Sequence, residues 1–183
     1  MQRLDTKMLA FASVLGALAA ASEVIRGPPF DIPFPLLPGV VSWDLTGIPM
    51  MVSLLFNGTL GGVYTSVIGC SIIFLRGNVP GGVFKLIAEL ATILAFAAMR
   101  RGVIANSIAA VTSRVVVMTG ANYLMLPIFY PLYYPSGAAV VGILLPLAAF
   151  NLTQALLNIV PSYIIYNRLA NAWRFWATTK TNP

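Results

Sequence analysis

Histidine is absent from this chain of 183 residues, and the only cysteine is Cys70. These absences exclude a His/Cys zinc site, a haem held by histidine, a Ser-His-Asp triad and any disulfide within the chain. Carboxylates are scarce as well, and the five that occur are Asp5, Glu23, Asp31, Asp44 and Glu89. A metal site or an acid–base catalytic centre would have to be assembled from these few groups.

Charge is also scarce, since 9% of the residues are charged and 58% are hydrophobic. Soluble domains average about 25% charged and roughly 45–50% apolar residues. Together with a mean hydropathy of +0.86, this composition excludes a water-soluble globular domain and a disordered chain. It is typical of an all-α integral membrane protein. We expect a single transmembrane domain over residues 1–183.

Apolar windows separated by glycine, proline and asparagine breaks predict six transmembrane helices. The predicted spans lie near residues 8–25, 44–57, 59–75, 82–99, 103–127 and 138–168. The first 22 residues also resemble a cleavable signal peptide, and cleavage would leave five spans.

The basic residues predict the orientation of these spans. Six crossings bring seven of them to one side: Arg3, Lys7, Arg100, Arg101, Arg168, Arg174 and Lys180. The opposite loops hold Arg26 and Arg76. By the positive-inside rule both termini are cytoplasmic, in a multi-pass protein of the plasma membrane. This placement also explains the net charge of +6 without a nucleic-acid partner.

The segment 26–39 between the first two spans contains five prolines. Proline cannot continue a helix, so we expect extended or turn backbone here. The phenylalanines and leucines of the segment indicate a loop that folds over apolar surface. Two alternatives remain open, a lid over a binding pocket and a passive external loop.

Polar side chains inside the spans are the best pointer to a site, because they are unfavourable in lipid unless they face protein or a cavity. Asn151, Gln154 and Asn158 share one face of the last span. Arg114 and Asn122 lie close to one face of the fifth. Carboxamides both donate and accept hydrogen bonds, so they suit a heterocycle that presents both kinds of group. Hydrogen bonds between helices are the alternative role.

Two further features carry expectations, a pair of charges and two aromatic residues. Lys85 and Glu89 are spaced i, i+4 and can neutralise each other as a structural ion pair. Tyr123 or Trp43 can stack on a planar ligand or belong to an interfacial aromatic belt.

Small residues mark one face of the first span. Ala12, Gly16 and Ala20 recur every four residues, a spacing that lets another helix approach closely. The strip serves either packing within the bundle or docking of a partner protein.

Four stretches of the chain form a set of motifs: 43–51 (WDLTGIPMM), 56–62 (FNGTLGG), 114–130 and 150–154 (FNLTQ). Together they resemble a known family, the riboflavin-type S components of energy-coupling factor (ECF) transporters. The motifs occur in the family's order, and the similarity covers residues 8–170. At Gln154 the sequence departs from the family, which usually carries lysine there; a carboxamide in place of an ammonium changes the number of donors and removes a positive charge next to the ligand.

The resemblance implies a six-helix vitamin-binding subunit that is not an enzyme and needs no cofactor or metal. Its implied partners are a transmembrane coupling protein and two ATPases, with docking at Ala12, Gly16 and Ala20. The chain itself has no phosphate-binding loop. Asn122 and Asn151 match the family's pocket asparagines. The expected substrate-binding residues are Trp43, Asp44, Thr46, Lys85, Asn122, Tyr123, Asn151 and Gln154.

The expected ligand is riboflavin or a related planar heterocycle, bound without covalent chemistry. Thiamine and a queuosine precursor are alternatives. Two other functions are alternatives to an S component. One is a carrier that transports its substrate without partner subunits. The other is an intramembrane enzyme, which would have to rely on Glu89 or Lys85 alone for acid–base chemistry.

Overall fold

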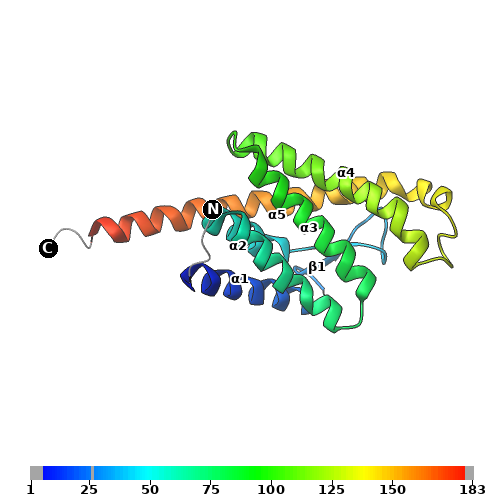
Figure 1. The fold of residues 1–183 in the computed structure, drawn as a ribbon, viewed down its shortest axis with the longest axis horizontal. Coiled ribbons are helices and arrows are strands. Elements are labelled where there is room, and N and C mark those ends of the chain that lie inside the picture. Colours follow the sequence, from blue (N-terminus) through cyan, green and yellow to red (C-terminus); the bar gives the residue numbers. More distant parts are fainter. Residues whose placement is uncertain (1–5, 26, 180–183) are drawn as a thin grey trace.

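The computed structural model describes residues 6–25 and 27–179, with side chains as far as residue 171. In chain order the elements are α1 (Thr6–Val24), β1 (Asp31–Pro33), β2 (Ser42–Asp44), α2 (Gly47–Leu75), α3 (Val79–Met99), α4 (Val103–Phe129) and α5 (Gly137–Thr179). All five helices are long and apolar enough to cross a membrane. The predicted all-α membrane class is therefore confirmed. Figure 1 shows α5 running along the bundle and extending past it at the C-terminal end.

Helix α2 is bent back on itself at Gly58, so its two segments run antiparallel. Gly58 has φ 72° and ψ −169°, a conformation that is essentially restricted to glycine. Thr65 Oγ1 lies 2.7 Å from Ser53 Oγ, although these residues would be about 18 Å apart along a straight helix. The predicted break between the second and third spans lies at this hairpin.

The first segment of α2 is shorter than the span predicted for residues 44–57. Residues 47–57 extend over about 16 Å, against roughly 30 Å for the hydrocarbon core of a bilayer. Before α2 begins, the chain enters the bundle as the antiparallel pair of β1 and β2, with Asp31 opposite Asp44. This extended backbone replaces the outer turns of a full-length helix. The five helices thus contain six helical segments, one of which is too short to cross alone.

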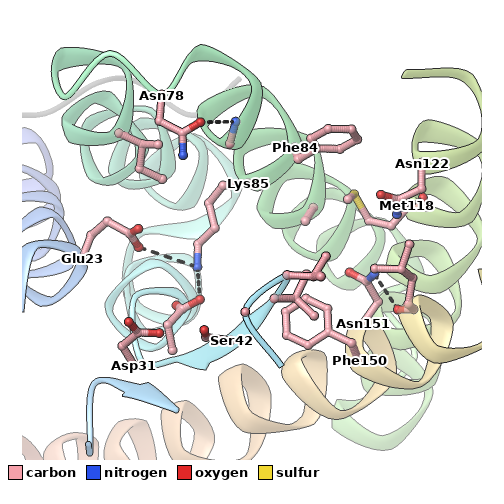
Figure 2. A pocket seen from close by; sticks show the side chains of 18 of the residues that line it. Glu23, Asp31, Ser42, Asn78, Phe84, Lys85, Met118, Asn122, Phe150 and Asn151 are labelled. Carbon is pink, nitrogen blue, oxygen red and sulfur yellow. Dashed lines mark hydrogen bonds and ion pairs between the residues drawn. The ribbon is translucent and has the colours of Figure 1, made fainter. Parts of the chain in front are cut away.

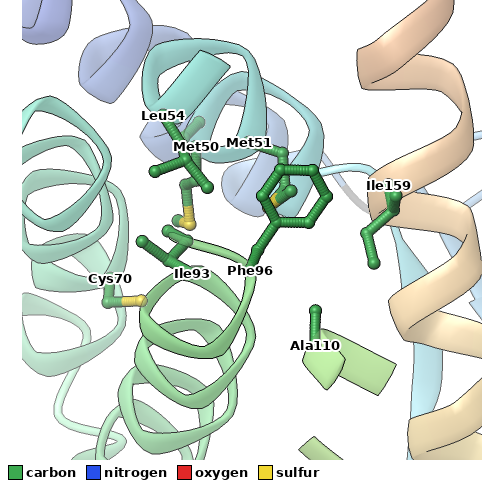
Figure 3. Packing of buried hydrophobic residues seen from close by; sticks show 9 residues of the cluster. Met50, Met51, Leu54, Cys70, Ile93, Phe96, Ala110 and Ile159 are labelled. Atoms are coloured by element: carbon green, nitrogen blue, oxygen red, sulfur yellow. The ribbon is translucent and has the colours of Figure 1, made fainter. Parts of the chain in front are cut away.

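A buried cluster centred on α2 and α3 holds the bundle together. Met50, Met51 and Leu54 of α2 pack against Ile93 and Phe96 of α3 (Figure 3). Lipid tails are as apolar as these side chains, so close packing rather than exclusion from water stabilises such contacts.

Helix α1 packs mainly on α2 and uses its small residues to do so. A Cβ added to Gly16 would lie 2.8 Å from Ile68 Cβ, and Thr65 Oγ1 donates to the Ala12 carbonyl at 3.1 Å. Ala12 and Gly16 are buried in these contacts, whereas Ala20 is partly exposed. Ala12 and Gly16, which were expected to dock a partner protein, are therefore covered by α2 of the same chain, because small residues also allow the α2 hairpin to approach closely.

Candidate ligand-binding site

A cavity of about 960 Å³ lies at the end of the bundle where α1 and α2 end and α3 and α5 begin. Its size is within the range of small-molecule sites, which is about 300–1,000 Å³. All five helices and the loop after α1 contribute to its lining. Aromatic rings include Phe30, Phe84, Tyr130, Tyr134 and Phe150, and carboxamides include Asn122 and Asn151. Apolar walls with a few polar groups are typical of ligand pockets.

The loop between α1 and α2 forms one wall of this cavity. Phe30, Asp31, Val41 and Ser42 from the loop all line it. Phe34 is buried and packs between Trp43 and Phe150, with ring centroids 5.1 and 5.6 Å away. Of the two alternatives for the proline-rich segment, the structure thus favours a cover over the cavity.

An ionic cluster joins three elements at one side of the cavity (Figure 2). The Lys85 ammonium of α3 forms an ion pair with Asp44 of β2 and lies 4.0 Å from Glu23 Oε2 at the end of α1. The Thr46 amide donates to Asp44 Oδ1 at 2.9 Å, and the Thr46 hydroxyl donates to Glu23 Oε2 at 3.0 Å. The cluster ties the loop to both helices.

The charge of Asp44 follows from these contacts. Burial by itself raises the pKa of a carboxyl group, but here the positive charge of Lys85 and the hydrogen bonds from Lys85 and Thr46 outweigh it. The pKa of Asp44 therefore lies below its ordinary value of 3.8. Asp44 is a carboxylate at neutral pH.

A second ion pair closes the inner end of the cavity. Arg114 of α4 is 2% exposed and lies 3.0 Å from Glu89 Oε1 of α3. Its Nε donates to Asn151 Oδ1 at 3.3 Å, and its Nη1 also donates to Thr92 Oγ1 at 3.3 Å. Arg114 thus joins α3, α4 and α5 while lining the cavity.

The expected ion pair between Lys85 and Glu89 is absent from the described residues. Lys85 pairs with Asp44 instead, and Glu89 pairs with Arg114. The i, i+4 spacing places two side chains on one face of a helix, but both residues find better-placed partners on other elements. This expectation was wrong.

The two cavity asparagines project from facing helices (Figure 2). The Asn122 amide donates to the Met118 carbonyl at 2.6 Å, and the Asn151 amide donates to the Leu147 carbonyl at 2.9 Å. Asn122 Oδ1 accepts no hydrogen bond from the described residues, so this acceptor is available to a ligand.

Of the residues expected to bind substrate, four line the cavity and four do not. Those in the lining are Asp44, Lys85, Asn122 and Asn151, and those outside it are Trp43, Thr46, Tyr123 and Gln154. The Trp43 indole donates to Thr153 Oγ1 at 2.8 Å, and Tyr123 lies against Gly137.

Gln154 is fully buried behind the cavity and anchors β2 to α5. Its amide nitrogen donates to the Asp44 carbonyl at 2.8 Å, and its amide oxygen accepts from the Asp44 backbone N–H at 3.1 Å. It also donates to Asn158, whose own amide donates to both oxygens of Glu89. Gln154 thus connects the loop strand to the Glu89–Arg114 pair.

Sequence reasoning missed several residues of the cavity. Glu23 was a visible signal, since it is a carboxylate at the end of an apolar span. Phe84 gave no signal, because aromatic residues are common throughout the spans, and Phe150 was marked only as the first residue of the stretch 150–154. Within the described residues no group of three His, Cys, Asp or Glu side chains could hold a metal ion.

Comparisons with known proteins give a match in structure and none in sequence. No family model matches the chain, and neither does any curated protein. A solved structure described as "Structure and mechanism of the S component of a bacterial ECF transporter" superposes with a TM-score of 0.77 and 22% sequence identity. The alignment covers 91% of this chain and 97% of that chain. The likeness shows that the two proteins share a fold.

Proposed function

We propose that this chain is the membrane-embedded substrate-binding subunit, or S component, of an ECF-type importer. The observation that carries the proposal is the cavity with its aromatic walls and two asparagines, in a fold shared with an S component over 91% of the chain. Such a subunit binds its ligand and performs no chemistry on it. Transport energy would come from partner ATPases.

The orientation of the bundle is part of the proposal. The cavity lies at the end of the bundle opposite to the Arg100–Arg101 turn. With basic residues cytoplasmic, it faces the outside, where a nutrient arrives. If all six helical segments cross the bilayer, both termini are cytoplasmic, and we propose this orientation in the plasma membrane.

The proposed ligand is riboflavin or a related planar heterocycle. Phe84 and Phe150 offer ring faces, and the free Asn122 Oδ1 together with Asn151 offers hydrogen-bonding groups. The test is the absorbance spectrum of the protein purified in detergent, followed by mass spectrometry of what denaturation releases. We expect a yellow preparation that releases riboflavin, and Asn122→Ala should weaken binding about tenfold by removing one hydrogen bond to the ligand.

A colourless preparation that also fails to quench the fluorescence of added riboflavin would contradict the flavin assignment. Thiamine and the queuosine precursor would then be tested by calorimetry. Uptake by the purified chain alone in liposomes would contradict the S-component assignment and favour a stand-alone carrier.

The coupling protein is proposed to dock on the part of α1 that faces away from α2. Ala17 and Ala21 are spaced four residues apart there and are exposed, unlike Ala12 and Gly16. Close helix approach requires small residues, so Ala17→Leu should abolish co-purification with co-expressed coupling subunits while leaving ligand binding intact. Val14→Leu, on the same exposed face, is the control.

A further inference from the structure

The charges that line the cavity carry information about the charge of its ligand. Three acidic and three basic side chains occur in the described lining: Glu23, Asp31, Asp44, Arg76, Lys85 and Arg114. The question is which of the cations is free to meet an anionic group.

Arg114 is not free. Its guanidinium is buried against Glu89, and its remaining described contacts are to Thr92 and Asn151. Glu89 is itself 0% exposed and receives two further hydrogen bonds from Asn158. The positive charge at the inner end of the cavity is therefore matched by an equally fixed negative charge.

Lys85 is not free either. It pairs with Asp44 and lies 4.0 Å from Glu23, and its side chain is only 13% exposed.

Arg76, by contrast, is exposed at the rim, where it donates to the Glu23 carbonyl at 3.1 Å. Asp31 adds a carboxylate that makes no ion pair with the described residues.

The one lining cation without an ion pair among the described residues is Arg76, at the rim. Deeper in the cavity an anionic ligand group would meet carboxylates, while Lys85 and Arg114 are already paired. Burying a charge without a partner is strongly unfavourable. We propose that the cavity below the Arg76 rim rejects ligands that place an anionic group there, and that Asp44 and Glu89 set this specificity by neutralising Lys85 and Arg114. The inference rests on the proposed function, because it concerns the ligand of the same site.

The test compares vitamins with their own phosphate esters on the purified wild-type chain in detergent. Riboflavin and riboflavin 5′-phosphate form one pair, measured by fluorescence quenching, and thiamine and thiamine monophosphate form the other, measured by calorimetry. In the pair whose parent compound binds, we expect the phosphate ester to bind about tenfold more weakly or worse.

Two variants test the role of the counter-ions. Asp44→Asn removes the nearer of the two carboxylates that face Lys85 and leaves only Glu23 at 4.0 Å. The ratio of the Kd of the phosphate ester to the Kd of its parent should therefore fall by about tenfold. Asp31→Asn removes one negative charge from the same cavity, but Asp31 makes no ion pair with a described cation. The ratio of the two Kd values should therefore fall by less than about threefold. Should Asp44→Asn not fold, Glu89→Gln replaces it, and the wild-type comparison stands by itself.

The outcomes separate the two proposals. A phosphate ester that binds as tightly as its parent overturns the charge inference and leaves the S-component proposal standing. If Asp31→Asn and Asp44→Asn lower the ratio of the two Kd values equally, the role given to Asp44 as the counter-ion of Lys85 is overturned. If no member of either pair binds, the proposed vitamin function fails, and the charge inference fails with it.

Discussion

Replacing Gln154 with leucine tests whether this residue holds the loop or the ligand. The substitution keeps the approximate volume but removes three hydrogen bonds, two to the Asp44 backbone and one to Asn158. It also leaves buried polar groups without partners, which are unfavourable by about 1–3 kcal/mol each. Some relaxation of β2 will offset part of this, so we expect a loss of roughly 3 kcal/mol in the free energy of unfolding.

The assay is thermal unfolding of the ligand-free protein in detergent, and the expected fall in Tm is roughly 5 °C or more. Ligand affinity should fall as well, because β2 carries Asp44 into the cavity wall. Asn167→Leu is the matched control, since it exchanges an exposed carboxamide of the same helix. An unchanged Tm together with a large loss of affinity would refute the anchoring role and make Gln154 a direct ligand contact.

Three further predictions follow from the geometry. In Gly47→Ala the added Cβ would overlap the Asn158 carboxamide and displace it from Glu89. The variant should therefore have a lower Tm and weaker ligand binding than the wild type. A wild-type Tm and affinity would show that Asn158 can move without cost. Gly58→Ala forces a non-glycine residue into a glycine conformation, and unfolding measurements should show a loss of about 1–3 kcal/mol. Asp44→Asn should lower the Tm by the same amount at every pH from 8 to 5. The pKa of Asp44 is below 3.8, so the stability from its ionised form is complete above the unfolded pKa and is lost only as the pH falls through the folded pKa. A difference that already shrinks between pH 7 and 5 would contradict that assignment.

The sequence was sufficient for the helices of the fold, except for the outer end of the span predicted at 44–57, where β2 lies. Long apolar windows set where the helices run, because a lipid-exposed backbone must satisfy its hydrogen bonds within a helix. The glycine at position 58 and the prolines of segment 26–39 marked the two places where helix is interrupted, since each residue type acts locally on its own backbone. The asparagines of the cavity were also visible, because polar groups stand out in an apolar span.

Only the tertiary structure decided which side chains meet. The small residues of α1 marked a face for close helix approach, but the sequence could not decide whether this face packs within the bundle or docks a partner, because lipid and protein interior are equally apolar. Lys85 and Glu89 took partners on β2 and α4 rather than each other, and Gln154 turned to the Asp44 backbone rather than to the cavity. Sequence spacing fixes only the face of a helix on which a side chain lies. Its partner depends on which other elements the fold brings to that face, and in this protein the loop strand β2 reaches both Lys85 and Gln154.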